Sequence, residues 1–385
     1  MQTAEVVVVG AGVVGASIAS HLIARGIRDV VILERDRGPG LGSTSKATGG
    51  FRAQFGSAIN VRLSLLSRTK LRDFEAEHGV DPGYDPRGYL FLAETGEQLA
   101  ALAAANRIQR ENGLEEAQVI GAGEARELSP AAVSSSILGA AFCPTDGFIR
   151  PMQILAGYLG SSLGRGLRVD YNRGSVSARR NGNRIDRIVA GSHEIVPGIV
   201  INATGAWAGE FSRSCGYELP VRPLRRQVAC TVPTDVLPET MPMTIFVSDG
   251  FHLRVRDGRV LMLWPDSADH IPEEVVVQND WLERIAMLQR KHIPLLDDVA
   301  IDAANCWAGL YEMSPDDHAI LGRCPDIENL YFANGSSGHG VMHSPAIGQL
   351  IAELIIDGRA SSIDISPLRP ERFAEGDLVA ATPLL

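Results

Sequence analysis

The chain has 385 residues, of which 45% are hydrophobic and 21% charged, and it carries a net charge of −10. This length suits two domains, and the acidic balance does not indicate a nucleic-acid partner. The five cysteines are scattered and form no C-x-x-C pair, which argues against a disulfide framework and a zinc site, so we expect no metal. The opening apolar run is too short to span a membrane, and because a strand begins by residue 4 we expect no secretion signal and a cytoplasmic location.

The start of the chain predicts a strand, a glycine-rich turn, a helix and a second strand. Residues 4–9 are apolar and largely β-branched, which is typical of a buried strand. Residues 13–26 predict a helix, and residues 29–33 predict the second strand. This order is the context in which a G-x-G-x-x-G turn indicates a dinucleotide site rather than a merely structural turn.

Each residue of this motif has a physical role. Gly10 allows the tight turn, Gly12 allows backbone to approach a pyrophosphate, and Gly15 allows the helix to pack closely on the strand. The helix N-terminus offers free N–H groups to the pyrophosphate. Glu34 ends the second strand, where its carboxylate would accept hydrogen bonds from ribose hydroxyls. These residues predict a dinucleotide-binding domain.

The rest of the chain mixes helices with short strands. The predicted helices cover residues 59–78, 97–111, 151–163, 281–291 and 346–356. The predicted strands cover residues 88–93, 137–142, 198–205 and 329–333, with two or three more within 167–190 and a β-rich stretch from 222 to 263. Asp257-Gly258 lies between alternating segments of that stretch and predicts a hairpin.

These elements predict two interleaved domains. Residues 1–84, 148–219 and 305–385 would form a Rossmann-like nucleotide-binding α/β domain. Residues 85–147 and 220–304 would form a mostly antiparallel β-sheet substrate domain, so that the whole chain is α+β. We expect the active site where the two domains meet.

Six segments of the chain, taken in order, resemble one protein family. They are VVVVGAGVVGASIASHL…VVILERD, STSKATGGFRAQF, TDGFIRP, VINATGAWA, WAGLYEMSPDDHAILG and NGSSGHGVMHSPAIGQLIAELI. Over its full length the chain resembles the FAD-dependent amine and D-amino-acid oxidase superfamily. Within it, the chain is most similar to the branch of sarcosine oxidase, glycine oxidase and the proline dehydrogenase β-subunit.

The resemblance implies FAD as the cofactor. The adenosine would lie toward Glu34 and Val176, and the isoalloxazine toward residues 44–52, 309–311 and 338–342. The expected cofactor-binding residues are Gly10, Gly12, Val13, Val14, Gly15, Glu34, Arg35, Ser43, Thr44, Ser45, Lys46, Thr48, Gly49, Gly50, Val176, Ala203, Thr204, Gly205, Trp207, Gly309, Gly338, His339, Gly340, Val341 and Met342.

The chain departs from the family pattern at three positions. Gly309 stands where monomeric sarcosine oxidases attach FAD through a cysteine, and Cys306 is a poor substitute, so we expect noncovalent FAD. Met342 stands where those enzymes have a lysine that helps to hold the substrate carboxylate, and Tyr311 stands where glycine oxidases have an arginine for this purpose. The substrate identity is therefore open.

Three residues near the implied flavin are candidates for substrate binding or catalysis. Arg52 would pair with a substrate carboxylate, or would instead form a salt bridge between domains. His339 would contact the flavin or orient the amine, the alternative being a packed histidine bonded to backbone. Tyr311 would donate its hydroxyl to the carboxylate, or would be a buried core aromatic.

Three further residues are candidates, and two of them, His252 and Arg254, would compensate for the missing carboxylate-binding residues. His252 and Arg254 are two residues apart on one predicted strand and so share a face. If this face points toward the flavin, they would bind the carboxylate; the alternative is a solvated strand face. Lys46 could assist oxygen reduction near the flavin, although a surface lysine is the simpler interpretation.

Together these features predict an FAD-dependent oxidase of small secondary or N-methyl amino acids, with sarcosine as the first candidate substrate. A hydride would pass to the flavin, the resulting imine would hydrolyse, and O2 would become H2O2. One alternative is an imino-acid (proline) dehydrogenase subunit that passes electrons to a partner. An alternative of another class is a noncatalytic flavoprotein assembly factor.

Overall fold

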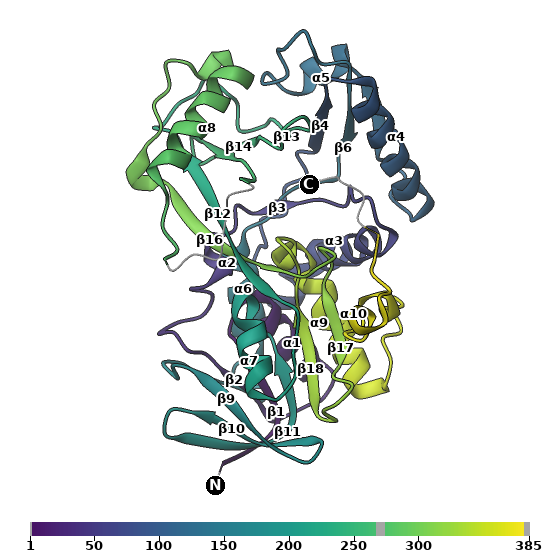
Figure 1. Cartoon of the computed structure of the whole chain (residues 1–385), viewed down its shortest axis with the longest axis vertical. Coiled ribbons are helices and arrows are strands. Elements are labelled where there is room, and N and C mark those ends of the chain that lie inside the picture. Colours follow the sequence, from purple (N-terminus) through teal and green to yellow (C-terminus); the bar gives the residue numbers. More distant parts are fainter. Residues whose placement is uncertain (1, 267–273, 381–385) are drawn as a thin grey trace.

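The computed structural model of the chain describes residues 2–266 and 274–380 and contains two eight-stranded sheets, one in each half of the molecule (Figure 1). The first sheet has the order β17-β18-β11-β1-β2-β8, with the hairpin β9-β10 attached to β11. The second has the order β16-β12-β15-β14-β13-β4-β6-β5. These two sheets confirm the predicted mixed fold class.

The first sheet is parallel at its centre, where β1 pairs with both β2 and β11. β8 and β18 extend it in parallel, and β17 is antiparallel to β18. Its strands are β1 (Gln2–Val9), β2 (Val30–Leu33), β8 (Leu167–Asp170), β9 (Val176–Asn181), β10 (Arg184–Ala190), β11 (His193–Asn202), β17 (Ile320–Arg323) and β18 (Leu330–Asn334).

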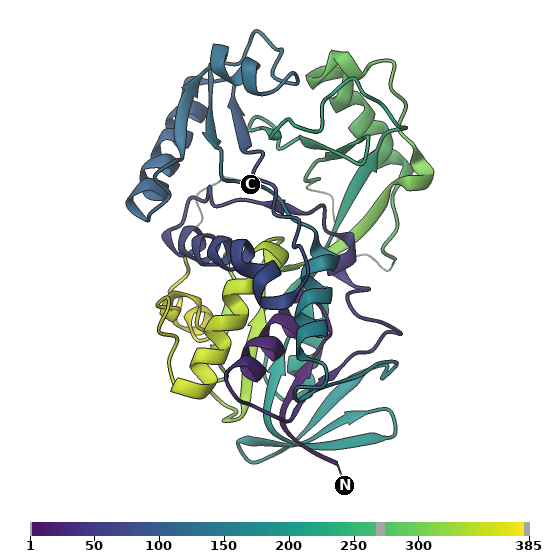
Figure 2. The same ribbon diagram turned by 180° about the vertical axis from the view of Figure 1, so that it is seen from behind.

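Both faces of this sheet are covered, which explains why β1 is almost entirely apolar. Val6 and Val8 face the core beneath four helices, whereas Val7 and Val9 face a second core beneath the β9-β10 hairpin and α7 (Ala208–Ser214). Figure 2 shows the four helices side by side on one face. They are α1 (Val13–Ala24), α3 (Ala58–His78), α6 (Pro151–Ser162) and α9 (Gly340–Asp357).

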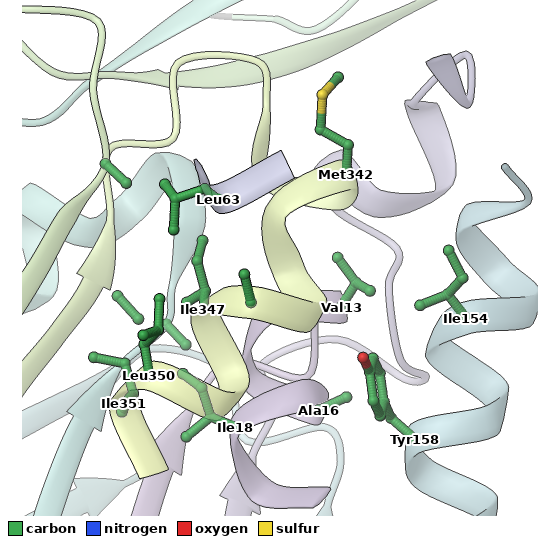
Figure 3. Close-up of a cluster of buried hydrophobic side chains, with 14 of the residues drawn as sticks. Val13, Ala16, Ile18, Leu63, Ile154, Tyr158, Met342, Ile347, Leu350 and Ile351 are labelled. Atoms are coloured by element: carbon green, nitrogen blue, oxygen red, sulfur yellow. The ribbon is translucent and has the colours of Figure 1, made fainter. Parts of the chain in front are cut away.

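Helix α1 is packed between α6 and α9, and this contact fixes the glycine-rich turn that precedes it. Figure 3 shows apolar side chains from all three helices meeting, with Ile18 beside Leu350 and Ile351, and Ala16 toward Tyr158. All of these side chains are buried. The start of α1 is therefore held rigidly under the edge of the first sheet.

The second sheet is antiparallel except where β13 pairs with β4. Its strands are β4 (Tyr89–Ala93), β5 (Gln118–Gly121), β6 (Gly139–Cys143), β12 (Arg222–Cys230), β13 (Met243–Phe246), β14 (His252–Arg256), β15 (Arg259–Leu263) and β16 (Trp307–Met313). The remaining elements are α2 (Ser43–Lys46), α4 (Gly96–Glu111), α5 (Ala122–Leu128), α8 (Asn279–His292), α10 (Arg372–Glu375) and the strand pair β3 (Gly50–Phe51) and β7 (Gly147–Phe148).

The predicted hairpin at Asp257-Gly258 joins β14 to β15, and both residues have positive φ, as a tight turn between twisted strands requires. The predicted boundary at residue 305 does not follow the sheets. β16 lies beyond it yet pairs with β12 along its whole length, from Trp307 to Met313. The second sheet thus includes a strand that the sequence analysis placed in the first domain.

Helix α9 begins at Gly340 rather than at residue 346 as predicted, so Pro345 lies inside it. Proline has no N–H to donate to the carbonyl four residues earlier, which here is that of Val341. The Ser344 hydroxyl donates to this carbonyl at 2.9 Å and replaces the missing bond. The helix therefore runs through the proline and brings its first turn to the edge of the sheet. None of the helices described has the length and apolar character needed to cross a membrane.

Candidate functional site

A cavity of about 1150 Å³ lies between the carboxyl ends of the first-sheet strands and one face of the second sheet. It exceeds the upper limit of about 1,000 Å³ that is usual for pockets holding one drug-sized ligand. Val9 and Leu33 line it where β1 and β2 end, and Phe91 and Ile245 line it from the second sheet. It therefore has room for a large cofactor together with a small substrate.

The glycine-rich turn closes one end of the cavity. Gly10 has φ of +109°, and a Cβ there would lie 2.4 Å from the carbonyl oxygen of Ala203. A Cβ on Gly15 would lie 2.1 Å from the Gly10 carbonyl oxygen. Gly12 lines the cavity and precedes the first residue of α1, whose N–H groups point out of the helix there. This arrangement fits a pyrophosphate at the helix N-terminus.

Glu34 stands beside this turn with its carboxylate fixed in place. Its Oε2 accepts the N–H of Ala11 at 2.8 Å and its Oε1 accepts the N–H of Asp36 at 2.9 Å. Each oxygen has a further lone pair for a ribose hydroxyl. The Arg35 guanidinium lies 3.5 Å from the ring centroid of Trp207, and both residues line the cavity. These residues fit the adenosine half of FAD.

Arg52 and His339 both line the cavity and contact each other. Nη2 of Arg52 lies 3.2 Å from Nε2 of His339. A guanidinium can only donate, so His339 Nε2 accepts and the ring proton sits on Nδ1. Burial and the charge of Arg52 lower the pKa of His339 well below its usual value, which agrees with this neutral form. The Arg52 guanidinium also lies 4.2 Å from the ring centroid of Phe55.

A second histidine, His343, contacts the Arg52 segment through Ser64. The Ser64 hydroxyl donates to the Arg52 carbonyl at 2.8 Å, so His343 Nε2, also 2.8 Å away, must donate to Ser64. His343 is buried and not part of the cavity lining, and burial lowers its pKa to about 3. It therefore supports the Arg52 segment from a position outside the cavity.

Tyr311 lines the cavity from β16, and burial raises the pKa of its hydroxyl. Arg226 lines the cavity from the neighbouring strand β12, with its guanidinium 5.7 Å from the Tyr311 ring centroid. Arg226 is not among the site residues predicted from the sequence. The sequence around Arg226 predicts a strand. Which face of that strand meets the cavity depends on the pairing of Arg226 with Gly309, which is distant in the sequence.

The rest of the second-sheet face over the cavity is largely apolar. Phe91, Met243, Ile245 and Leu263 line it from three strands. His252 lies among them, and its Nδ1 is 2.8 Å from the Gly250 carbonyl oxygen. A carbonyl only accepts, so Nδ1 carries the proton, and burial lowers the pKa of this histidine to about 4.

Arg254 does not reach the cavity, contrary to the prediction that it binds a carboxylate there. Its guanidinium donates to the Thr48 carbonyl at 2.9 Å and lies 3.5 Å from the ring centroid of Phe148. Arg254 and His252 lie on the same face of β14. At the position of Arg254, however, Thr48 and Gly49 cover this face, so its side chain contacts them instead of the cavity. Burial lowers its pKa to about 10.

Most of the predicted cofactor-binding residues line this cavity. The two that do not are Gly15, which packs against the turn, and Ser45, whose hydroxyl donates to the Gly42 carbonyl. Lys46 lines the cavity beside Gly309, where a Cβ would lie only 2.7 Å from the Lys46 Cβ. Their roles remain predictions, but the structure gathers them around one space.

Comparison with known proteins agrees with this geometry. Residues 5–354 match the model of the DAO family, described as FAD dependent oxidoreductase. "FAD-dependent oxidoreductase domain-containing protein 1" of Xenopus laevis is 28% identical, over 97% of this chain and 83% of that protein. Glycine oxidase of Geobacillus kaustophilus is 26% identical, over 94% and 95% respectively. The crystal structure of L-proline dehydrogenase from P. horikoshii has a TM-score of 0.91 and 28% identity, covering 98% of this chain and 99% of that one.

Proposed function

The chain belongs to the DAO family of FAD-dependent oxidoreductases, and on that basis we propose that it oxidises a small secondary or N-methyl amino acid, with sarcosine as the first substrate to test. The observation that carries this proposal is the Arg52 guanidinium in the wall of the cavity, bonded to the neutral His339. A fixed cation beside an apolar wall fits a small molecule that combines a carboxylate with short alkyl groups.

Arg52 would bind the substrate carboxylate, and Arg226 and Tyr311 would complete the anion site. The apolar face of the second sheet, including Met243 and Ile245, would exclude water and hold the alkyl groups. Arginine gives two parallel hydrogen bonds to a carboxylate, which fixes the direction of the carbon that loses the hydride. These residues thus bind and orient the substrate.

The amine is expected to react as the free base. The guanidinium groups of Arg52 and Arg226 disfavour a further positive charge on the amine, and His339 and His252 are neutral because burial lowers the pKa of each. Bound FAD would supply the hydride acceptor. The rate of flavin reduction should therefore rise with pH through the pKa of the bound amine, and a rate independent of pH would contradict this.

We further propose that FAD is held noncovalently. All five cysteines are described in the structure, and none of them lines the cavity. Gly309 has no room for a side chain beside Lys46, and Cys306 instead contacts Cys230 and Asp302. Denaturation in acid should release the flavin, whereas colour retained on the precipitated protein would show a covalent bond.

A second candidate is an imino-acid dehydrogenase that passes electrons to a partner rather than to O2. The similarity to the L-proline dehydrogenase structure, at a TM-score of 0.91, favours it. The test is anaerobic flavin reduction by sarcosine, proline, glycine, D-alanine and dimethylglycine. Both candidate functions predict that sarcosine or proline bleaches the flavin absorbance. Rapid recolouring in air with peroxide would identify an oxidase, and slow recolouring a dehydrogenase. Bleaching by no member of the panel would contradict both.

A further inference from the structure

A carboxyl group without an assigned role borders the cavity. Glu312 follows Tyr311 on β16, and its Oε1 accepts the N–H of Ser336 at 3.3 Å. Its Oε2 is buried and has no hydrogen-bond partner in the described part of the chain, and the same holds for the Ser336 hydroxyl. A Cβ on Gly340 would lie 3.6 Å from Glu312 Oε1. The carboxyl therefore lies directly behind the loop that carries His339.

The surroundings of Glu312 favour a change of protonation near neutral pH. Burial raises the pKa of its carboxyl to about 7, although hydrogen bonds from Ser336 and Gly335 lower it. Two other titratable groups, Tyr311 and His339, line the same cavity. Burial raises the pKa of Tyr311 and lowers that of His339, so both are neutral at pH 7. Of these three groups, Glu312 is the one that can gain or lose charge at neutral pH.

Glu312 lines the same cavity that would hold the cofactor. The pyrophosphate fits at Gly12 and the adenosine near Glu34, and the flavin ring would extend from there into the part of the cavity that Tyr311 and Glu312 line. Two-electron reduction adds negative charge there. In a buried site a nearby negative charge makes a carboxylate bind a proton more tightly.

We propose that Glu312 takes up one proton from solvent when the bound flavin is reduced by two electrons, and releases it on reoxidation. The donor supplies both electrons and the hydrogen that travels with them. The carboxylate of Glu312 and a solvent proton form one O–H bond, so no other oxidant or reductant is needed. The neutral acid would then limit the charge that accumulates in the cavity. This proposal depends on FAD binding but on no particular substrate.

The pH dependence of the flavin midpoint potential tests this, with the holoenzyme reduced at an electrode. Above pH 7, where the Glu312 carboxyl of the oxidised protein is largely ionised, we expect the wild type to take up as much as one proton more per two electrons than Glu312→Gln, whose amide cannot titrate. Glu210→Gln is the matched control, because Glu210 lines the cavity but is exposed. It should keep the wild-type proton number. Equal proton numbers in the wild type and E312Q would overturn the proposal.

If E312Q does not retain FAD, a measurement on the wild-type holoenzyme alone tests the proposal. Its reduced-minus-oxidised infrared spectrum should gain the carbonyl band of a protonated carboxylic acid, and a spectrum without that band would overturn the proposal. Because the electrode replaces the amine, a failure of every amine to bleach the flavin would count against the proposed function and leave this result unaffected.

Discussion

Single residues shape the cavity, and many of those that line it were predicted from the sequence to bind FAD. The glycines of the turn, Glu34 and Arg52 could be selected because their roles depend on nearby sequence or on a motif. The sequence alone could not show which of Arg226 and Arg254 reaches the cavity. Both lie on strands of the second sheet, and only the position along each strand decides that Arg226 meets the cavity and Arg254 meets Phe148.

At this scale the Gly10→Ala variant should lose FAD. A Cβ at this position would lie 2.4 Å from a backbone oxygen, and the positive φ adds strain. Gly26→Ala is the matched control, because Gly26 also has a positive φ, of +107°, but nothing within 4 Å of its Cβ position. Gly26→Ala should cost about 1–3 kcal/mol of stability from backbone strain but should keep its FAD. The visible absorbance of the purified proteins measures this, and a yellow G10A protein would contradict the expectation.

At the scale of elements, the sequence predicts most helices and strands but misplaces the start of α9. Pro345 normally indicates a boundary, and the replacement hydrogen bond from Ser344 becomes evident only in three dimensions. The six added residues matter because they place His339 and His343 on consecutive turns beside Arg52. The helix thereby ties the C-terminal part of the chain to the segment after α2.

The buried histidines should make the protein less stable in acid. Burial lowers the pKa of His343 from 6.5 to about 3 in the folded state. Above pH 6.5 the ring is neutral in both states. Below it the unfolded chain binds a proton that the folded chain does not, so stability falls as pH drops from 6.5 toward 3, by up to about 1.4 kcal/mol per pH unit.

Urea unfolding of the holoenzyme across this pH range measures the effect. His343→Gln keeps an N–H donor for Ser64 but cannot titrate, so its stability should fall less steeply with acid than that of the wild type. His193→Gln changes an exposed histidine and should leave the slope unchanged. If the stability of H343Q and of the wild type fell equally steeply with pH, His343 would not contribute to the loss of stability in acid.

For the whole molecule, a buried ion pair closes the fold at its C-terminal end. Arg372 is fully buried and binds Asp316 through Nε at 2.8 Å and Nη2 at 2.9 Å. Although burial opposes it, bonding to Arg372 lowers the pKa of Asp316. Asp316 lies in the turn between β16 and β17, so this pair links the end of the chain to the strand that carries Tyr311. Such long-range pairing, like that of β16 with β12, has no local signal in the sequence.

Breaking this pair should be costly. Asp316→Asn leaves the Arg372 charge buried without its partner, which typically costs about 3–5 kcal/mol. Glu375→Gln breaks an exposed pair with Arg369 nearby and should cost less than about 1 kcal/mol. Denaturant unfolding at neutral pH compares the two variants. Equal stabilities would mean that the buried pair does not hold the C-terminal segment.

The proposed function depends on Arg52 as the residue that binds the substrate carboxylate. The most direct measurement compares anaerobic flavin reduction by sarcosine and by dimethylamine, which is sarcosine without its carboxylate, at equal FAD occupancy. In the wild type we expect sarcosine to be favoured by roughly 10- to 100-fold, because a charged hydrogen-bonded contact contributes about 1.5–3 kcal/mol. In Arg52→Gln this preference should be largely lost. A wild type that reacts with neither compound, or a preference unchanged by the substitution, would contradict the account.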